Sequence, residues 1–171
     1  LQMCVKNLVN ATVVINQGMY TLLGDNRALG GSTPGDTTVN GGTLNAWNTM
    51  TVSERIMFNG GAVAQGNISN TFVLAGHLTV NSNVLANSGS SRGVEITGYV
   101  DGQGGFTQQG AGWLTLAGNT NAYTGPTTVN SGCPLWVGRP GTSHGAWGPG
   151  VVTHYGRTYF YSGRFGSGAI V

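Results

Sequence analysis

Side chains that could carry acid–base or nucleophilic chemistry are few and dispersed in this chain. Its 171 residues include five carboxylates, which are Asp25, Asp36, Glu54, Glu95 and Asp101. A glycosidase or lyase needs carboxylates gathered at one site. Glu95 and Asp101 could neighbour each other across a turn, but a surface charge beside an exposed loop is the simpler interpretation. No catalytic residue is therefore predicted, and we do not expect an enzyme.

Histidines and cysteines do not show the spacing of a metal site. The chain has His77, His144 and His154, and neither Cys4 nor Cys133 lies close in sequence to a histidine. Structural zinc ligands usually come in closely spaced pairs, so no metal and no cofactor are predicted. Two cysteines also fall short of a disulfide framework. We expect two small buried side chains, and the alternative is a bridge from Cys4 of one copy to Cys133 of the next.

A cluster of aromatic residues near the end of the sequence is the feature that could bind a ligand. It comprises Trp136, Trp147, Tyr155, Tyr159, Phe160, Tyr161 and Phe165. Rows of flat rings can stack on sugars, which suits an adhesin, whereas stacking inside the fold or against a neighbouring chain is the alternative. The candidate intersubunit or ligand contacts are therefore Cys4, Cys133, Trp136, Trp147, Tyr155 and Tyr159.

The composition of the chain predicts an all-β fold, and the elements of this fold must position the residues above. Glycine accounts for 31 residues, charged residues for 7% and hydrophobic residues for 39%. A disordered chain would carry more charge and fewer apolar residues, and a collagen would place glycine at every third position. The net charge of +2 comes from scattered Lys and Arg. Nucleic acid is therefore not an expected partner, and no apolar run is long enough to span a membrane.

The sequence shows no helical periodicity. It consists of short apolar segments separated by Gly and Asn. Examples are 37–40, 43–47, 55–58 and 94–97. Gly and Asn tolerate the positive φ that tight turns require. Such strands could form an antiparallel sandwich, which the Asn-Gly pairs at 40–41 and 59–60 would suit. They could also form a coil of parallel strands.

Repetition within the chain favours the coil. Thr-Thr-Val-Asn-X-Gly occurs at 37–42 and again at 127–132. Self-similarity of this kind indicates stacked repeats, and Asn or Thr beside the turns could form hydrogen-bonded ladders. With roughly 20 residues in each rung, the chain would make about eight coils. At a strand spacing of ~4.8 Å, the rod would be on the order of 40 Å long.

Residues 110–132 resemble the autotransporter-associated β-strand repeat. They read GAGWLTLAGNTNAYTGPTTVNSG, and the family pattern is approximately G-x-G-x-L-T-L-x-G-x-N-T-Y-T-G-x-T-T-V-N-x-G. The chain has one extra residue near Asn121 and Ala122, and it places Cys133 and Pro134 where the family has Gly or Thr. The motif is strongest at 110–138, and a related segment lies at 22–47. We treat residues 1–171 as a single β-solenoid segment.

This resemblance implies a right-handed parallel β-helix at the bacterial cell surface or outside the cell, usually as part of a much longer passenger. The motif is structural and carries no catalytic residues. Residues 1–5 and 168–171 read as strands without caps, so we expect an excerpt of a passenger or head-to-tail pairing of copies into a surface filament. A monomeric adhesin that binds glycans is the alternative, followed by a fragment of a carbohydrate-active enzyme.

Overall fold

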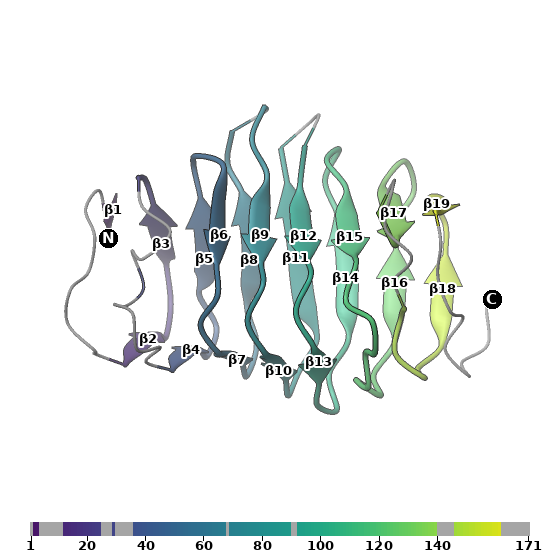
Figure 1. Ribbon diagram of the computed structural model, residues 1–171, viewed down its shortest axis with the longest axis horizontal. Helices are drawn as coiled ribbons and strands as arrows, with labels where there is room; N and C mark the ends of the chain where they lie inside the picture. Colours follow the sequence, from purple (N-terminus) through teal and green to yellow (C-terminus); the bar gives the residue numbers. More distant parts are fainter. Residues whose placement is uncertain are drawn as a thin grey trace.

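The computed structural model describes residues 2–3, 12–24, 29, 36–67, 69–89, 92–139 and 146–161. These residues form an all-β parallel solenoid, as the sequence predicts. Figure 1 shows the rungs side by side along the long axis, from β1 (Gln2–Met3) to β19 (Arg157–Phe160). Within the described part of the chain, no helix is long and apolar enough to cross a membrane.

The strands form three parallel sheets. Sheet A contains β1, β3 (Met19–Leu22), β5 (Thr43–Ala46), β8 (Ala62–Gln65), β11 (Val84–Ser88), β14 (Phe106–Gln109), β16 (Thr127–Val129) and β18 (Val152–His154). Sheet B contains β2 (Val13–Ile15), β4 (Thr37–Val39), β7 (Ile56–Phe58), β10 (Leu78–Val80) and β13 (Val100–Asp101). Sheet C contains β6 (Met50–Val52), β9 (Phe72–Leu74), β12 (Val94–Ile96), β15 (Leu114–Leu116), β17 (Pro134–Val137) and β19.

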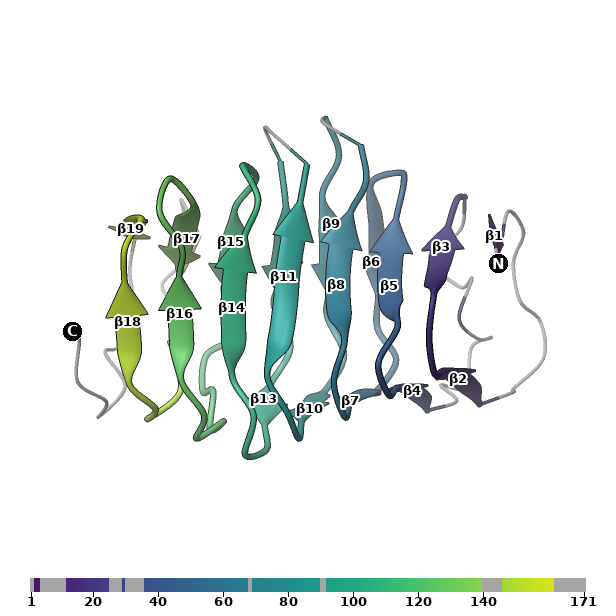
Figure 2. The ribbon, with the colours of Figure 1, turned by 180° about the vertical axis from the view of Figure 1, so that it is seen from behind.

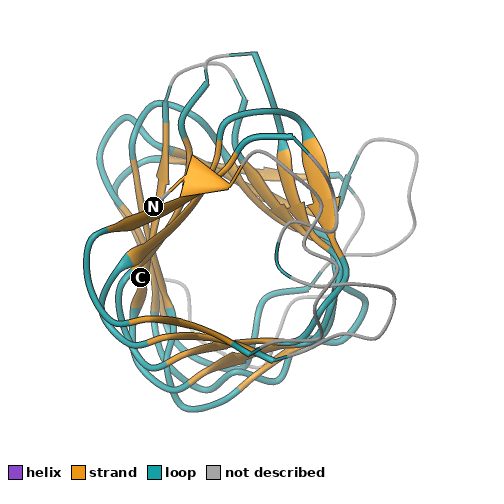
Figure 3. Ribbon diagram, turned by 90° about the vertical axis from the view of Figure 1, so that its left-hand side faces the viewer, coloured by secondary structure: helices purple, strands orange, loops and turns teal. Residues whose placement is uncertain are grey.

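The chain visits the sheets in turn, so strands that are neighbours in space lie about one turn apart in sequence. Figure 2 shows sheet A with its strands side by side, and Figure 3 shows the strands superimposed along the coil axis. Leu44 lies opposite Val63 and Val129 opposite His154, which are offsets of 19 and 25 residues. The coil makes about six turns, fewer than the predicted eight. Every pairing of the described strands is parallel, so the antiparallel sandwich is wrong.

The core fills the inside of the coil because alternate side chains of each strand point inward. In β7, Ile56 and Phe58 are fully buried, whereas Met57 between them is 38% exposed. Each such apolar side chain contributes about 1.5–3 kcal/mol on burial. Tyr123 also enters the core, where its ring meets Phe106 edge-on at 5.2 Å. Its hydroxyl lies 2.8 Å from Thr127 Oγ1, so the buried phenol is hydrogen-bonded.

A ladder of asparagines lines the turn between sheets B and A. Nδ2 of Asn40 donates to Oδ1 of Asn16 (2.7 Å), that of Asn59 to Asn40 (2.8 Å), and that of Asn81 to Asn59 (2.9 Å). Identical amides one rung apart can repeat this bond because parallel strands keep them in register. The predicted ladder is therefore confirmed at these positions.

The turn between sheets C and B brings successive backbones too close together for side chains. A Cβ atom added to Gly98 would lie 1.8 Å from the carbonyl oxygen of Gly76, and one added to Gly118 would lie 2.3 Å from that of Gly98. Glycine is required at this corner by close approach of the rungs, since none of the three has a positive φ.

The two Thr-Thr-Val-Asn copies do not occupy equivalent places in the coil. The first forms β4 in sheet B, and the second forms β16 in sheet A. Both strands nevertheless bury their first and third residues. The repeated motif therefore specifies a strand that buries its first and third residues and is followed by a turn. It does not specify which sheet the strand joins.

Candidate functional site

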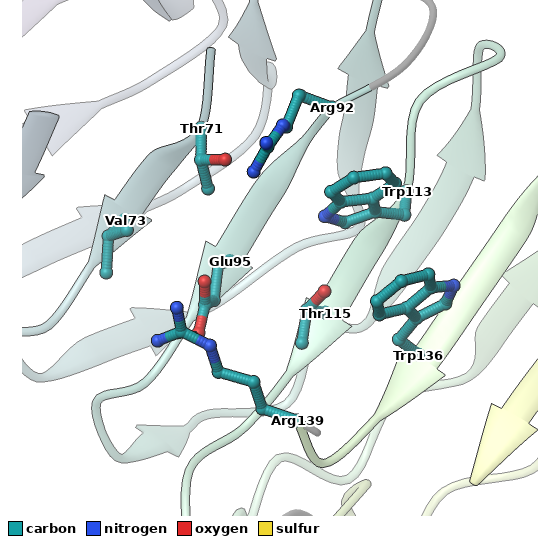
Figure 4. Close-up of a pocket in the computed structure, with 8 residues that line it drawn as sticks. All are labelled: Thr71, Val73, Arg92, Glu95, Trp113, Thr115, Trp136 and Arg139. Carbon is teal, nitrogen blue, oxygen red and sulfur yellow. The ribbon is translucent and has the colours of Figure 1, made fainter. Parts of the chain in front are cut away.

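A groove on the outer face of sheet C is the candidate functional site. It has a volume of about 520 Å³, and its lining residues are Thr71, Val73, Arg92, Glu95, Trp113, Thr115, Trp136 and Arg139. Figure 4 shows Arg92 and Arg139 reaching over it from opposite sides, with the two tryptophans together along one edge. Small-molecule sites typically occupy about 300–1,000 Å³, so the groove is large enough for a ligand.

The floor of the groove is one row of outward-facing residues in register. Val73 pairs with Glu95, Glu95 with Thr115, Thr115 with Trp136, and Trp136 with Tyr159. Side chains on the outer face of a solenoid normally meet solvent, but Glu95 is only 6% exposed and Thr115 only 2%. Their burial shows that the residues around them rise above the strands and wall in the floor.

The carboxylate at the floor is held by one arginine. Nη1 of Arg139 lies 3.3 Å from Oε1 of Glu95 as an ion pair. The geometry is not that of a hydrogen bond, and Oε1 accepts none from the part of the chain that the structure describes. A buried carboxylate is costly unless its oxygens are bonded. The pairing with Arg139 offsets that cost in part.

Two tryptophans form the aromatic edge of the groove. The rings of Trp113 and Trp136 stack with centroids 4.8 Å apart and planes inclined by 14°. Tyr159 meets Trp136 at 6.0 Å and Tyr161 meets it at 5.1 Å. The guanidinium of Arg92 lies 6.0 Å from the ring centroid of Trp113, at the outer limit of a cation–π contact.

The predicted contact residues separate into different environments. Trp136 and Tyr159 come together beside the groove, whereas Tyr155 is 67% exposed at a turn outside the groove lining. Trp147 is buried and packs edge-on against Phe160 at 5.2 Å, so the interior alternative applies to it. Its indole belongs to the hydrophobic core cluster.

Of the two cysteines, Cys133 lies within the described residues. Cys133 is buried, as expected, with Sγ 3.8 Å from the carbonyl oxygen of Ser131. Cys4 lies outside the described residues, and so does Phe165 of the aromatic cluster. The bridge from Cys4 to Cys133 of another copy stays a prediction.

Glu95 and Asp101 do not form a carboxylate pair. Glu95 is on β12 in sheet C, whereas Asp101 is on β13 in sheet B, where its Oδ2 lies 2.9 Å from Nε2 of His77. Each carboxylate therefore has its own basic partner on a different face. The interpretation of Glu95 as a surface charge is also wrong, because its side chain is buried at the groove floor.

Arg92, Glu95, Trp113 and Arg139 are groove residues that sequence reasoning did not group together. The usable signal is spacing by one turn, since Glu95, Thr115 and Trp136 follow each other at offsets of 20 and 21 residues. Arg92 lies two residues before β12 begins at Val94, and Trp113 lies one residue before β15 begins at Leu114. Both therefore stand at the entry to sheet C.

A second buried carboxylate lies apart from the groove. Oγ1 of Thr37 donates a hydrogen bond to Oε1 of Glu54. Burial raises the pKa of Glu54, the Thr37 hydrogen bond opposes that rise, and the charge of Asp36 adds to it. The pKa of Tyr20 is raised mainly by burial and, to a smaller extent, by the negative charge of Glu54. Among the described residues, no three His, Cys, Asp or Glu side chains form a group that could hold a metal ion.

Comparison with known families identifies one segment of the chain. Residues 106–132 match the passenger-associated-transport-repeat, so the chain carries an autotransporter passenger repeat within its parallel β-solenoid. The resemblance found in the sequence is thus confirmed. Neither the search of curated proteins nor that of solved structures gave a match.

The matched segment covers one complete turn of the coil and the first strand of the next. It begins on β14 in sheet A, passes through β15 in sheet C and returns to sheet A at β16. Asn121 stands where a sheet-B strand would pass. Its Oδ1 accepts a hydrogen bond from the amide of Val100 (3.2 Å), and its Nδ2 donates to the carbonyl of Ala146. Asn121, which lies where the chain has one residue more than the family pattern, therefore joins three consecutive rungs through its buried side-chain amide.

Proposed function

We propose that this chain is a structural segment of an exported passenger, a stiff β-solenoid that carries a binding surface outside the bacterial cell. The observation that supports this role is the coincidence of the transport repeat with one full turn of a regular coil. In the described part of the chain, adjacent rungs are joined by parallel strand pairs in the sheets, which suits an extended spacer.

Surface exposure can be tested on intact cells of the producing organism. Antibodies raised against the chain should label unpermeabilised cells, and brief treatment with an external protease should remove the label. Labelling only after permeabilisation would contradict the proposed location. A periplasmic marker protein that stays protected from the protease is the matched control for intact envelopes.

Head-to-tail stacking into a filament concerns terminal residues that lie largely outside the described part, and it stays a prediction. Negative-stain images of the purified chain test it. Long unbranched rods would support stacking, whereas short, monodisperse particles at all concentrations would contradict it.

Glycan binding by an adhesin surface is a second candidate function, and the groove on sheet C supports it. Aromatic rings, a buried carboxylate and two guanidinium groups line one concave site. Such a mixture of apolar rings and convergent polar groups is typical of ligand sites. A screen of immobilised glycans with the purified chain tests this function, and the absence of any saturable signal would contradict it.

We also propose that the chain is not an enzyme. The described carboxylates of Glu54, Glu95 and Asp101 lie beside different partners, Thr37, Arg139 and His77. Glycoside hydrolysis normally needs two carboxyl groups flanking one bond. Release of reducing ends from a glycan that binds the groove would contradict this proposal.

A further inference from the structure

The positive charge of the groove on sheet C is not balanced within the groove. Two guanidinium groups, those of Arg92 and Arg139, line it together with one carboxylate, that of Glu95. Arg139 forms the ion pair with Glu95. The ion pairs within the described chain give Arg92 no carboxylate partner, since Asp36 pairs with Arg55 and Asp101 with His77. The groove therefore has room for one additional negative charge near Arg92.

The position of Arg92 fits recognition of an anion that is attached to an apolar ring. Its guanidinium lies over Trp113, and Trp113 is stacked on Trp136. Arg92 is exposed and thus accessible to a ligand, and a guanidinium can bind a carboxylate with two parallel hydrogen bonds. The indole pair next to it offers the apolar surface against which a sugar ring can pack.

The floor of the groove is covered and offers little polar surface to a ligand. Oε1 of Glu95 is buried and accepts no hydrogen bond from the described chain, although Arg139 is 3.3 Å away. Thr115 lies beside Glu95 in the same row and is 2% exposed. The specific polar contact of a ligand is therefore expected at Arg92, which is exposed, and not at the floor.

From these contacts we infer that the groove binds an acidic saccharide. Its carboxylate pairs with Arg92, and its ring packs against the part of the stacked pair Trp113 and Trp136 that lines the groove. This inference deepens the glycan-binding function and rests on it, but it does not depend on the structural role of the solenoid.

Two matched pairs of probes test the inference by isothermal titration calorimetry at low salt. The first pair is trigalacturonate and its methyl ester, which have the same rings with and without charge. The second is sialyllactose and lactose. We expect at least one acidic probe to bind saturably and its neutral partner to bind about tenfold more weakly, as the loss of one charge-assisted contact predicts.

Two variants locate the site. Arg92→Gln should weaken binding of the acidic probe about tenfold and leave binding of the neutral one nearly unchanged, as removal of a charge contact predicts. Trp136→Leu should weaken both. Arg55→Gln and Trp47→Leu remove an exposed arginine and an exposed tryptophan outside the groove, and they should leave binding unchanged. Arg92 is exposed, so its variant remains informative if Trp136→Leu lowers the melting temperature.

The outcomes separate the inference from the function on which it rests. Equal binding of the acidic and neutral probes overturns the charge preference and leaves glycan binding standing. Failure of both acidic probes to bind at millimolar concentration overturns the inference. Binding that is indifferent to both Arg92→Gln and Trp136→Leu places the site elsewhere and overturns it as well.

Discussion

At the scale of single residues, Glu54 shows how a carboxyl group inside a solenoid depends on pH. Its side chain is 7% exposed, and burial is the largest cause of its raised pKa. Below the pKa of glutamate in the unfolded chain, about 4.3, Glu54 is protonated in both the folded and the unfolded state, and its burial carries no charge penalty. As the pH rises above that value, the unfolded chain releases the proton first, so the folded state loses stability.

Glu54→Gln should therefore stabilise the protein at neutral pH. The amide keeps an oxygen that can accept the hydrogen bond from Thr37, and it carries no charge to bury. We expect a rise of a few degrees in the melting temperature near pH 7 and almost none near about pH 3, where glutamate is already neutral. Thermal unfolding followed by circular dichroism across this range measures the difference. A gain of equal size at both pH values would show that charge burial is not the cause.

At the scale of elements, the asparagine ladder divides into central and terminal positions. The side chain of Asn59 donates to Asn40 and accepts from Asn81, whereas that of Asn16 takes part in one ladder bond. A net hydrogen bond contributes about 0.5–1.5 kcal/mol. Asn59→Ala should lower the free energy of unfolding by about 1–2 kcal/mol and Asn16→Ala by roughly half as much. Urea titrations measure both, and equal losses would mean that the bonds do not act as a ladder.

Glycines at two turns should respond differently to alanine. A Cβ at Gly98 would lie 1.8 Å from a backbone oxygen of the adjacent rung, so the rungs must move apart. Gly132 has φ of +78° but nothing within 4 Å of its added Cβ. We expect Gly98→Ala to cost about 3 kcal/mol or more, and Gly132→Ala to cost only the backbone strain of about 1–2 kcal/mol.

Chemical denaturation of the two glycine variants provides the comparison. Gly132→Asn is a useful third variant, because asparagine tolerates the left-handed region better than alanine does. Its loss of stability should be the smallest of the three. Similar losses for Gly98→Ala and Gly132→Ala would show that the close approach of rungs at Gly98 relaxes easily.

Much of each element could be predicted from sequence, because strand and turn signals are local. The motif at 110–132 predicts the strands β15 and β16, and Thr-Thr-Val-Asn predicts β4. The groove could not be predicted, because it depends on register between turns whose offsets vary from 19 to 25 residues. A shift of one residue moves a side chain to the opposite face of a strand. From sequence alone, Glu95 is therefore interpreted as an isolated surface charge, because the register that places it in one row with Thr115 and Trp136 is not known.

At the scale of the whole molecule, the coil is a one-dimensional stack in which each rung is stabilised by the rungs on either side. Strands such as β8 and β11 pair on both edges, and β14 pairs with β11 and β16. Stability in such a stack is close to a sum of nearest-neighbour terms, so opening starts where a rung has fewer neighbours. The isolated chain should thus unfold gradually from its outer rungs inward.

Hydrogen exchange measured by mass spectrometry tests this gradient. In dilute solution, peptides that cover β8, β11 and β14 should exchange most slowly, and those that cover β3 and β18 should exchange faster, because local opening is easier near the outer rungs. Head-to-tail stacking adds a second dependence, since docking of another copy would pair the outer rungs. Their protection should then rise with protein concentration while that of the central rungs stays constant. Outer rungs that exchange at the same rate at all concentrations would contradict stacking, and uniform protection along the coil would contradict the nearest-neighbour account.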